Sequence, residues 1–273
     1  MTDPSRSERV VGGVHILKAG QDESRPTVIL LHYFGGSLRE WRMVMERLAT
    51  ARGCIAVDLP GFGQSPPLRT YTLDGMADVV ETVVRSLKLR EYVLAGHSMS
   101  GKISVVIAAR RPPGLRGLVL VAPSPPTPEP MEEDKRSTAL KSNGLRRAAL
   151  STLETITAHP LAPDVLAEQV SDNVGTAPAA WTWWLADGSR VDVSDRIGRV
   201  EVPILVVGGS ADPVITPEVL DHDVITPLKG RIEKVVMADS GHLIPLEAPD
   251  VLAQAIESFV VGLGHHADQD SAG

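Results

Sequence analysis

The stretch Gly96-His97-Ser98-Met99-Ser100-Gly101 decides how this sequence is interpreted. It follows the run Glu91–Ala95, which is apolar after its first residue, and it precedes the helical run Ile103–Arg110. A strand, a sharp turn with small residues and a helix together form an elbow that holds a serine hydroxyl out above the end of a sheet. Ser98 is therefore the candidate nucleophile. The competing interpretation is a serine in an ordinary turn between a strand and a helix.

The elbow also predicts a place for negative charge to develop. At the start of the following helix the dipole is positive, and the backbone N–H of Met99 is free to donate to an oxyanion. Ser100 stands where such an elbow has its second glycine. Serine is small enough to keep the turn, and Gly101 follows, so we expect only a modest perturbation.

Outward from the elbow, short apolar runs bounded by Gly, Pro and Asp alternate with longer segments of helical period. This pattern predicts an α/β fold with a doubly wound, mostly parallel sheet. Gly12 and Gly13 interrupt the first run and favour an N-terminal hairpin at a sheet edge. The predicted strands are Val10–Lys18, Thr27–His32, Cys54–Asp58, Tyr92–Ala95, Leu115–Ala122, Ile204–Gly208 and Ile232–Met237.

Helices are predicted between these strands from the spacing of apolar residues. The first follows Ser37, its predicted N-cap, with Glu40 three residues later in the position of a capping partner. The others cover Thr72–Leu87, the segment from Ser98 to the residues before Pro112, and Asp250–Val261.

The alternation of strands and helices stops after Pro123. A Pro-rich, acidic stretch is followed by several short helical segments without a strand, which predicts a helical cap at 124–199 inserted into the sheet domain. The core of that domain is then 1–123 with 200–263, and 264–273 form a polar tail.

The predicted cap holds three of the four tryptophans, Trp181, Trp183 and Trp184. Two interpretations remain open for them. They attach the cap to the core, or at least one of them lines a substrate pocket.

A nucleophilic serine needs a base, and the base needs an acid to orient it. Asp212 follows the predicted strand Ile204–Gly208, and His242 follows Ile232–Met237. The carboxyl ends of parallel strands share one edge of a sheet, so both residues are expected near Ser98. We therefore predict Ser98 as nucleophile, His242 as base and Asp212 as acid.

Other titratable residues compete for these roles. His97 belongs to the elbow but points away from its neighbour, which favours a packed, hydrogen-bonded residue. Asp239 is too near His242 in the same loop to orient it. These comparisons favour His242 and Asp212.

The chain resembles the α/β-hydrolase fold superfamily, in its capped, esterase-like branch, from about Val10 to Leu263. Besides the elbow and the order serine, aspartate, histidine, Asp58-Leu59-Pro60-Gly61-Phe62-Gly63-Gln64-Ser65 matches the D-x-P-G-x-G-x-S loop of that family. Gly241-His242 with Glu247-Ala248-Pro249 matches its G-H-x(4)-E-x-P segment. The resemblance implies that the aspartate of the first motif is structural and that Glu247 caps or braces the last helix.

The same resemblance assigns the second donor of an oxyanion hole to the loop Leu31–Ser37. It implies that the backbone N–H of Phe34 acts there beside that of Met99. Tyr33 departs from the family pattern, because it stands where the motif H-G-x has glycine. Its side chain is expected to narrow the pocket or to place a phenol near the substrate.

Composition limits the classes of partner. The 273 residues hold 27 Lys and Arg against 34 Asp and Glu, a net charge of −7 that repels nucleic acids and anionic membranes. The single cysteine, Cys54, cannot form an internal disulfide or a cysteine zinc site. No apolar leader and no run near the ~18 residues of a membrane span are found, which predicts a soluble cytoplasmic protein.

The predicted function is hydrolysis of a carboxylic ester of a small to medium, mainly apolar substrate through an acyl-enzyme. No flavin, nicotinamide or metal motif is present, so no cofactor is expected. Cleavage of a carbon–carbon bond beside a ketone, or opening of a lactone, remains open with the same triad. Cofactor-free oxygen chemistry, or a ligand-binding protein without hydrolytic activity, is the alternative of another class.

Overall fold

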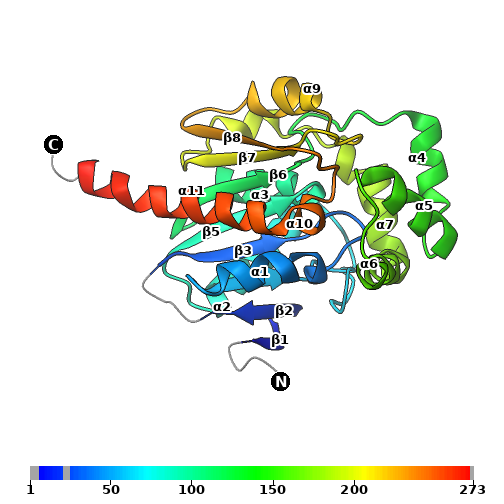
Figure 1. The fold of residues 1–273 in the computed structure, drawn as a ribbon, viewed down its shortest axis with the longest axis horizontal. Helices are drawn as coiled ribbons and strands as arrows, with labels where there is room; N and C mark the ends of the chain where they lie inside the picture. Colours follow the sequence, from blue (N-terminus) through cyan, green and yellow to red (C-terminus); the bar gives the residue numbers. More distant parts are fainter. Residues whose placement is uncertain (1–5, 21–24, 271–273) are drawn as a thin grey trace.

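A single eight-stranded sheet organises the described part of the chain, which comprises residues 6–20 and 25–270 of a computed structural model, with side chains as far as residue 264 (Figure 1). In space the strands follow the order β1-β2-β4-β3-β5-β6-β7-β8. In chain order they are β1 (Ser7–Val11), β2 (Val14–Ala19), β3 (Thr27–Leu31), β4 (Cys54–Val57), β5 (Tyr92–His97), β6 (Leu115–Val121), β7 (Ile204–Gly209) and β8 (Ile232–Met237).

The sheet is parallel except at its first edge. β1 pairs antiparallel with β2, and β2 antiparallel with β4, while the remaining strands pair in parallel. The predicted hairpin is confirmed: Gly12 and Gly13 form its turn with φ of +61° and +86°. The first predicted run, Val10–Lys18, is divided by this turn into β1 and β2, and β1 begins earlier, at Ser7. The other predicted strands agree with the observed ones to within about two residues at their ends. The α/β class and the mostly parallel sheet are therefore confirmed.

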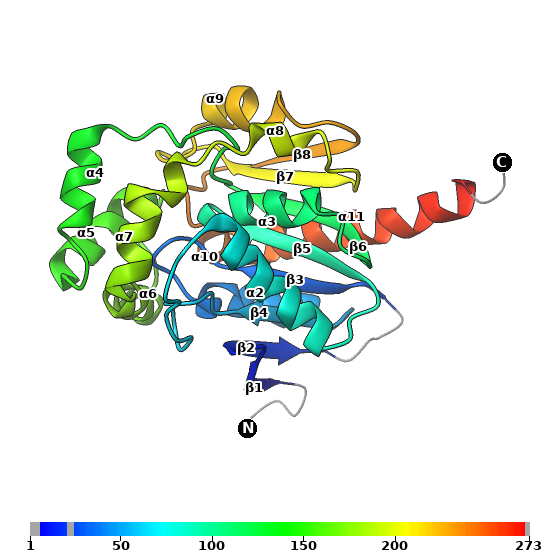
Figure 2. The ribbon, with the colours of Figure 1, turned by 180° about the vertical axis from the view of Figure 1, so that it is seen from behind.

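Helices cover both faces of the sheet, as Figures 1 and 2 show from opposite sides. One face carries η1 (Leu38–Trp41), α1 (Arg42–Leu48), α10 (Ile244–Glu247) and α11 (Pro249–Asp270). The other carries α2 (Leu73–Ser86), α3 (Met99–Ala109) and α8 (Ser194–Ile197). The short α9 (Pro217–Val219) and the π-type helix η3 (Leu220–Ile225) connect β7 to β8.

Two of these helices differ from the prediction. The first is divided into η1 and α1, with Ser37 accepting from the Arg39 N–H. The last runs to Asp270 rather than to Val261. No proline interrupts it after its first residue, and a glycine inside a helix costs only about 1 kcal/mol. Of the predicted polar tail, residues 271–273 and the side chains of 265–270 lie outside the described part.

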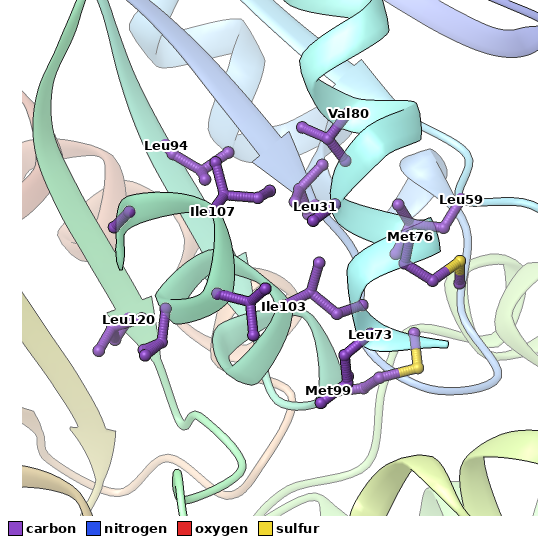
Figure 3. Packing of buried hydrophobic residues seen from close by; sticks show 14 of the residues in the cluster. Leu31, Leu59, Leu73, Met76, Val80, Leu94, Met99, Ile103, Ile107 and Leu120 are labelled. Carbon is purple, nitrogen blue, oxygen red and sulfur yellow. The ribbon is translucent and has the colours of Figure 1, made fainter. Parts of the chain in front are cut away.

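Apolar side chains fill the layers on either side of the sheet. Figure 3 shows part of the layer beneath α2 and α3, where the side chain of Met99 lies in the same cluster as Leu73 and Ile103. All three are buried. Burial of apolar surface on this scale holds α3, and with it the elbow, rigidly against the sheet.

Between β6 and β7 the chain forms helices, and this fully described stretch has no strand. Both views place the first four of them beyond the edge where the parallel strands end (Figure 2). These inserted helices are α4 (Glu133–Leu140), α5 (Arg146–Ile156), α6 (Pro163–Gly175), α7 (Pro178–Ala186) and η2 (Gly188–Arg190), before α8. Among the described helices, none combines the length and the apolar character needed to cross a bilayer.

A buried lysine attaches this insertion to the core. Lys102, on α3, is fully buried and donates to the main-chain carbonyls of Thr127, Ser189 and Val191 at 2.9, 3.2 and 3.1 Å. The first acceptor lies where the chain leaves β6, and the other two lie where it returns to the sheet. One side chain therefore holds both connections of the insertion, and its burial lowers the pKa of Lys102 to about 8.

Candidate active site

Ser98 occupies a strained turn between β5 and α3. Its φ of +52° with ψ of −116° lies outside the regions that a residue with a side chain prefers. The glycines around it permit the turn. A Cβ on Gly96 would lie 2.4 Å from the Ser100 carbonyl oxygen, and one on Gly101 would lie 2.4 Å from Pro123 Cβ. The half-buried hydroxyl stands at the end of β5, as the elbow predicts.

Ser100 is accommodated because the close approaches occur at positions 96 and 101 and not at 100. Its hydroxyl is buried and donates to the main-chain carbonyl of His32, at the end of β3. The departure from glycine therefore adds a hydrogen bond between the elbow and the neighbouring loop. The expected modest perturbation rests on the small size of serine and on the following Gly101, and neither of them predicts this bond.

The structure brings Ser98, His242 and Asp212 together in one chain of hydrogen bonds. His242 Nε2 lies 2.9 Å from Ser98 Oγ, and His242 Nδ1 lies 2.8 Å from Asp212 Oδ2. The other oxygen of Asp212 accepts from the N–H groups of Val214 and Ile215 at 2.7 and 3.0 Å. Both His242 and Asp212 are 3% exposed, so water competes little for these bonds.

These contacts determine which ring nitrogen of His242 carries the proton. The Asp212 carboxylate can only accept, so Nδ1 donates to it. In the neutral ring Nε2 then has a free lone pair, which accepts from the Ser98 hydroxyl. This is the arrangement in which an imidazole can remove the proton of a serine.

A second buried pair, which the sequence did not reveal, lies next to this chain of hydrogen bonds. His97 and Glu40 are both fully buried, with His97 Nδ1 3.2 Å from a Glu40 oxygen and His97 Nε2 2.9 Å from the His242 carbonyl oxygen. His97 is packed and hydrogen-bonded, as predicted. Glu40 was predicted as a capping partner of Ser37; instead it pairs with His97. The capping pattern depends on local spacing and does not report a residue 57 positions away.

Glu247 also differs from its predicted role. Its carboxylate accepts from the N–H groups of Gly241 and Leu243 at 3.0 and 3.1 Å, on either side of His242, and from Ala158 at 2.7 Å. The His242 N–H donates to the Ile156 carbonyl at 2.7 Å. Glu247 therefore braces the loop that carries His242 against the end of α5, rather than the last helix.

The loop after β3 carries the second predicted oxyanion donor. Within the described chain, the backbone N–H groups of Phe34 and Met99 make no hydrogen bond. The Tyr33 carbonyl, in the same peptide group as the Phe34 N–H, accepts from His32 Nδ1 at 2.7 Å and from the Gly36 N–H at 3.1 Å. His32 Nε2 in turn accepts from the Leu59 N–H at 3.0 Å.

The Tyr33 side chain turns into the layer between this loop and α6. Its ring lies against the backbone of Gly36, where a Cβ would be 2.4 Å away, and its hydroxyl donates to Gln169 Oε1 at 3.2 Å. Burial, together with the charges of Glu40 and Asp172, raises the pKa of Tyr33 well above its ordinary value. The phenol is therefore a permanent donor. A contact between Tyr33 and a substrate stays a prediction.

The three tryptophans of α7 are buried and pack against the core. The ring centroid of Phe34 lies 4.6 Å from the ring centroid of Trp181 and 6.5 Å from that of Trp184. Trp183 stacks on Tyr71 at 5.5 Å. These contacts fit the interpretation that the tryptophans attach the insertion to the core. Whether any of them also lines a substrate pocket stays a prediction.

Asp58 has the contacts of a structural residue. It accepts from the N–H groups of Leu38 and Gln64 at 2.7 and 2.9 Å, and from His15 Nδ1 at 2.9 Å. It thereby fixes the start of η1 to the loop after β4. Across the described ranges, no three His, Cys, Asp or Glu side chains are grouped so that they would hold a metal ion.

Comparison with known proteins places the chain in a family. Residues 28–255 match the profile of the alpha/beta hydrolase family. The chain is 28% identical, over 94% of its length and 70% of the relative's, to the dihydrolipoyllysine-residue acetyltransferase component of an acetoin cleaving system from Pseudomonas putida. It is 26% identical to a pimeloyl-(acyl-carrier protein) methyl ester esterase from Neisseria meningitidis, over 86% of this chain and 94% of that protein.

Solved structures share the fold. An esterase from Exiguobacterium antarcticum superposes with a TM-score of 0.81 at 20% identity, covering 93% of this chain and 98% of its own. An enol-lactonase from Burkholderia xenovorans gives a TM-score of 0.79 at 20% identity, covering 93% of this chain and all of that one. By the match over residues 28–255, the chain belongs to the alpha/beta hydrolase family.

Proposed function

We propose that the protein is a serine hydrolase that cleaves a carboxylic ester of a small to medium, mainly apolar substrate through an acyl-enzyme. The observation that carries this proposal is the continuous chain of hydrogen bonds from Ser98 through His242 to Asp212. Membership of the alpha/beta hydrolase family, with an esterase among the relatives, supports it.

In the first step Ser98 Oγ attacks the ester carbonyl and its proton passes to His242 Nε2. The imidazolium that results is stabilised by Asp212, which already accepts from Nδ1. The carbonyl oxygen becomes an oxyanion, and the N–H groups of Phe34 and Met99 are the donors proposed to bind it. His242 then protonates the leaving alcohol, which leaves the acyl group on Ser98.

In the second step water takes the place of the alcohol. His242 removes a proton from this water, which attacks the acyl carbonyl through a second tetrahedral oxyanion. Collapse of that intermediate returns the proton to Ser98 and releases the carboxylic acid. Each step transfers one proton through His242, so the enzyme returns to its starting state without a cofactor.

The apolar substrate class rests on the surroundings of Phe34. The residue that supplies a proposed oxyanion donor has its ring against Trp181 and within 6.5 Å of Trp184, both on the insertion. We propose that α4–α7 act as a cap over Ser98 and present an aromatic, apolar surface to the acyl or alcohol part.

The proposal is tested by labelling with a fluorophosphonate, which forms a stable phosphonyl ester on an activated serine. Intact mass is measured on the wild type, Ser98→Ala and His242→Ala, together with hydrolysis of short p-nitrophenyl esters. Expected is a single adduct on Ser98 in the wild type only, with ester hydrolysis lost in both variants. Ser104→Ala is the control, because Ser104 lies on α3 with a buried hydroxyl that has no partner in the described chain.

Two outcomes contradict the proposal. A folded wild type that takes no adduct and cleaves no ester has no activated serine, and the protein then falls among the ligand-binding or oxygen-activating alternatives. Full ester hydrolysis by Ser98→Ala shows that another residue carries the reaction.

A further inference from the structure

The direction of the Phe34 N–H is set by the peptide group to which it belongs. The Tyr33 carbonyl at the other end of that group has two donors, His32 Nδ1 and the Gly36 N–H. A trans peptide is planar, so its N–H points opposite to its C=O. Whatever holds residues 32 and 33 in place therefore also holds this N–H.

Ser100 joins this loop to the helix that carries the other donor. Its hydroxyl donates to the His32 carbonyl, and Ser100 is the residue after Met99 on α3. The Phe34 and Met99 N–H groups belong to different elements, following β3 and β5. The bond between Ser100 and His32 crosses directly between those elements.

Tyr33 fixes the loop from the opposite side. Its phenol donates to Gln169, which lies on α6 of the insertion, 136 residues away in the sequence. Both side chains are buried, at 3% and 0% exposed. The Gln169 amide nitrogen has no partner in the described chain. The hydrogen bond from the Tyr33 hydroxyl is therefore the one side-chain hydrogen bond that the Gln169 amide makes in the described chain.

We propose that Ser100 and Tyr33, the latter through Gln169, are positioning residues that fix the Phe34 N–H relative to the Met99 N–H. This inference rests on the proposed function, because it assigns those two N–H groups to the oxyanion. Ser100 ties the loop to the elbow, and Tyr33 ties it to the insertion. The geometry of the oxyanion hole therefore depends on the position of α6 as well as on the elbow.

The variants Ser100→Ala and Tyr33→Phe each remove one hydroxyl. Loss of a whole oxyanion donor costs about 10²–10³ in rate, and a displaced donor costs less, so we expect kcat to fall about 10- to 100-fold with KM nearly unchanged. Gln169→Met removes the acceptor and should match Tyr33→Phe, and the double variant should be no worse than either single one. Gln169→Glu keeps an acceptor oxygen and should recover part of the activity.

The matched controls also remove a buried hydroxyl. Ser104→Ala and Tyr92→Phe delete hydroxyls that have no hydrogen-bond partner in the described chain, one on α3 and one on β5. We expect both to keep kcat within about 2-fold of the wild type, because they leave the oxyanion donors in place. Thermal melting of all variants shows which of them remain folded.

A second readout separates positioning from general destabilisation. Phenylboronic acid is an inhibitor that accepts the Ser98 oxygen on its boron while the serine proton passes to His242. The tetrahedral boronate anion that forms resembles the first tetrahedral intermediate of ester hydrolysis. Its inhibition constant should rise about 10- to 100-fold in Ser100→Ala and Tyr33→Phe, in parallel with kcat. A loss of stability alone changes neither quantity in the folded fraction.

The result that overturns the inference is a Ser100→Ala or Tyr33→Phe variant that folds and behaves like its control in both kcat and boronate inhibition. If Tyr33→Phe does not fold, Gln169→Met tests the same hydrogen bond between Tyr33 and Gln169. A wild type that neither reacts with fluorophosphonate nor cleaves esters removes the proposed function, and this inference with it. An active wild type with insensitive variants removes the inference alone.

Discussion

The Nε2 atom of His97 lies 2.9 Å from the main-chain carbonyl oxygen of His242, so the residue before the nucleophile supports the residue that serves as its base. A carbonyl only accepts, so Nε2 carries a proton. Glu40 faces the other ring nitrogen at 3.2 Å, and both side chains are fully buried, so the His97 ring is held between the Glu40 carboxylate and the backbone of His242.

Replacing His97 by alanine should lower kcat, because the backbone of His242 loses its donor and the imidazole is less well placed against Ser98. A displacement of about 1 Å at a catalytic group can cost about 10²-fold, so we expect a loss of about 10- to 100-fold. Glu40→Gln should cost less than Glu40→Ala, since an amide N–H can donate to a neutral Nδ1. Ester kinetics and fluorophosphonate labelling rates measure this. Full activity in a folded His97→Ala protein would show that the contact is dispensable.

Asp212→Asn should abolish most of the activity while leaving the fold intact. The Asn oxygen can keep accepting from Val214 and Ile215, which turns its NH₂ group toward His242 Nδ1. The ring must then carry its proton on Nε2, where it cannot accept from Ser98, and kcat should fall by about 10⁴-fold. The matched control is Asp239→Asn, an exposed residue in the loop before His242. If both variants retain wild-type rates, Asp212 is not the acid.

Glu247→Gln should affect stability and catalysis together. Its carboxylate accepts hydrogen bonds from three N–H groups around His242. In glutamine an NH₂ group replaces one of the two oxygens, and this group cannot accept from the N–H groups that face it. Hydrogen bonds to a charged group contribute about 1.5–3 kcal/mol, so the free energy of unfolding should fall by that order and kcat should drop with it. Urea denaturation and ester kinetics give both quantities, with exposed Glu154→Gln as the control. An unchanged unfolding midpoint would contradict the bracing role.

Lys102 should make stability depend on pH in the alkaline range. Burial lowers the pKa of Lys102 from 10.5 to about 8 in the folded protein. Between those two values the unfolded chain binds a proton that the folded chain has released, so the free energy of unfolding rises with pH. The gain is absent below about pH 8. Lys102→Met should lack this rise, and denaturation at several pH values across the window measures the difference. A difference between the two proteins that is independent of pH would refute the assignment.

Much of the fold follows from local patterns in the sequence. Short apolar runs bounded by Gly, Pro and Asp gave strand positions because strands buried on both faces need unbroken apolar sequence. The meeting of Ser98, Asp212 and His242 follows from topology, because each one follows a parallel strand whose end lies at the same edge of the sheet. Neither inference needs knowledge of distant side-chain contacts.

The contacts that the sequence did not predict join residues far apart along the chain. Glu40 meets His97 over 57 positions, Ser100 meets His32 over 68, and Tyr33 meets Gln169 over 136. Spacing rules describe neighbours on one helix or strand, so they place Glu40 in a cap and do not reveal the partner of the Ser100 hydroxyl. The end of α11 was predicted too early because the glycines after Val261 weaken a helix without ending it.

The Lys102 side chain holds the insertion through main-chain carbonyls and not through side chains of the insertion. This has a consequence for how the sequence of such a protein can diverge. Every amino acid presents a carbonyl, so substitution at positions 127, 189 or 191 leaves the three acceptors in place as long as the backbone keeps its course. The segment between them can therefore change in sequence at positions other than those that support the active site, such as Gln169 against Tyr33, while its two ends stay attached to the helix that follows the nucleophile. New substrate preferences can arise at those other positions by point mutation, with the chemistry at Ser98 inherited unchanged.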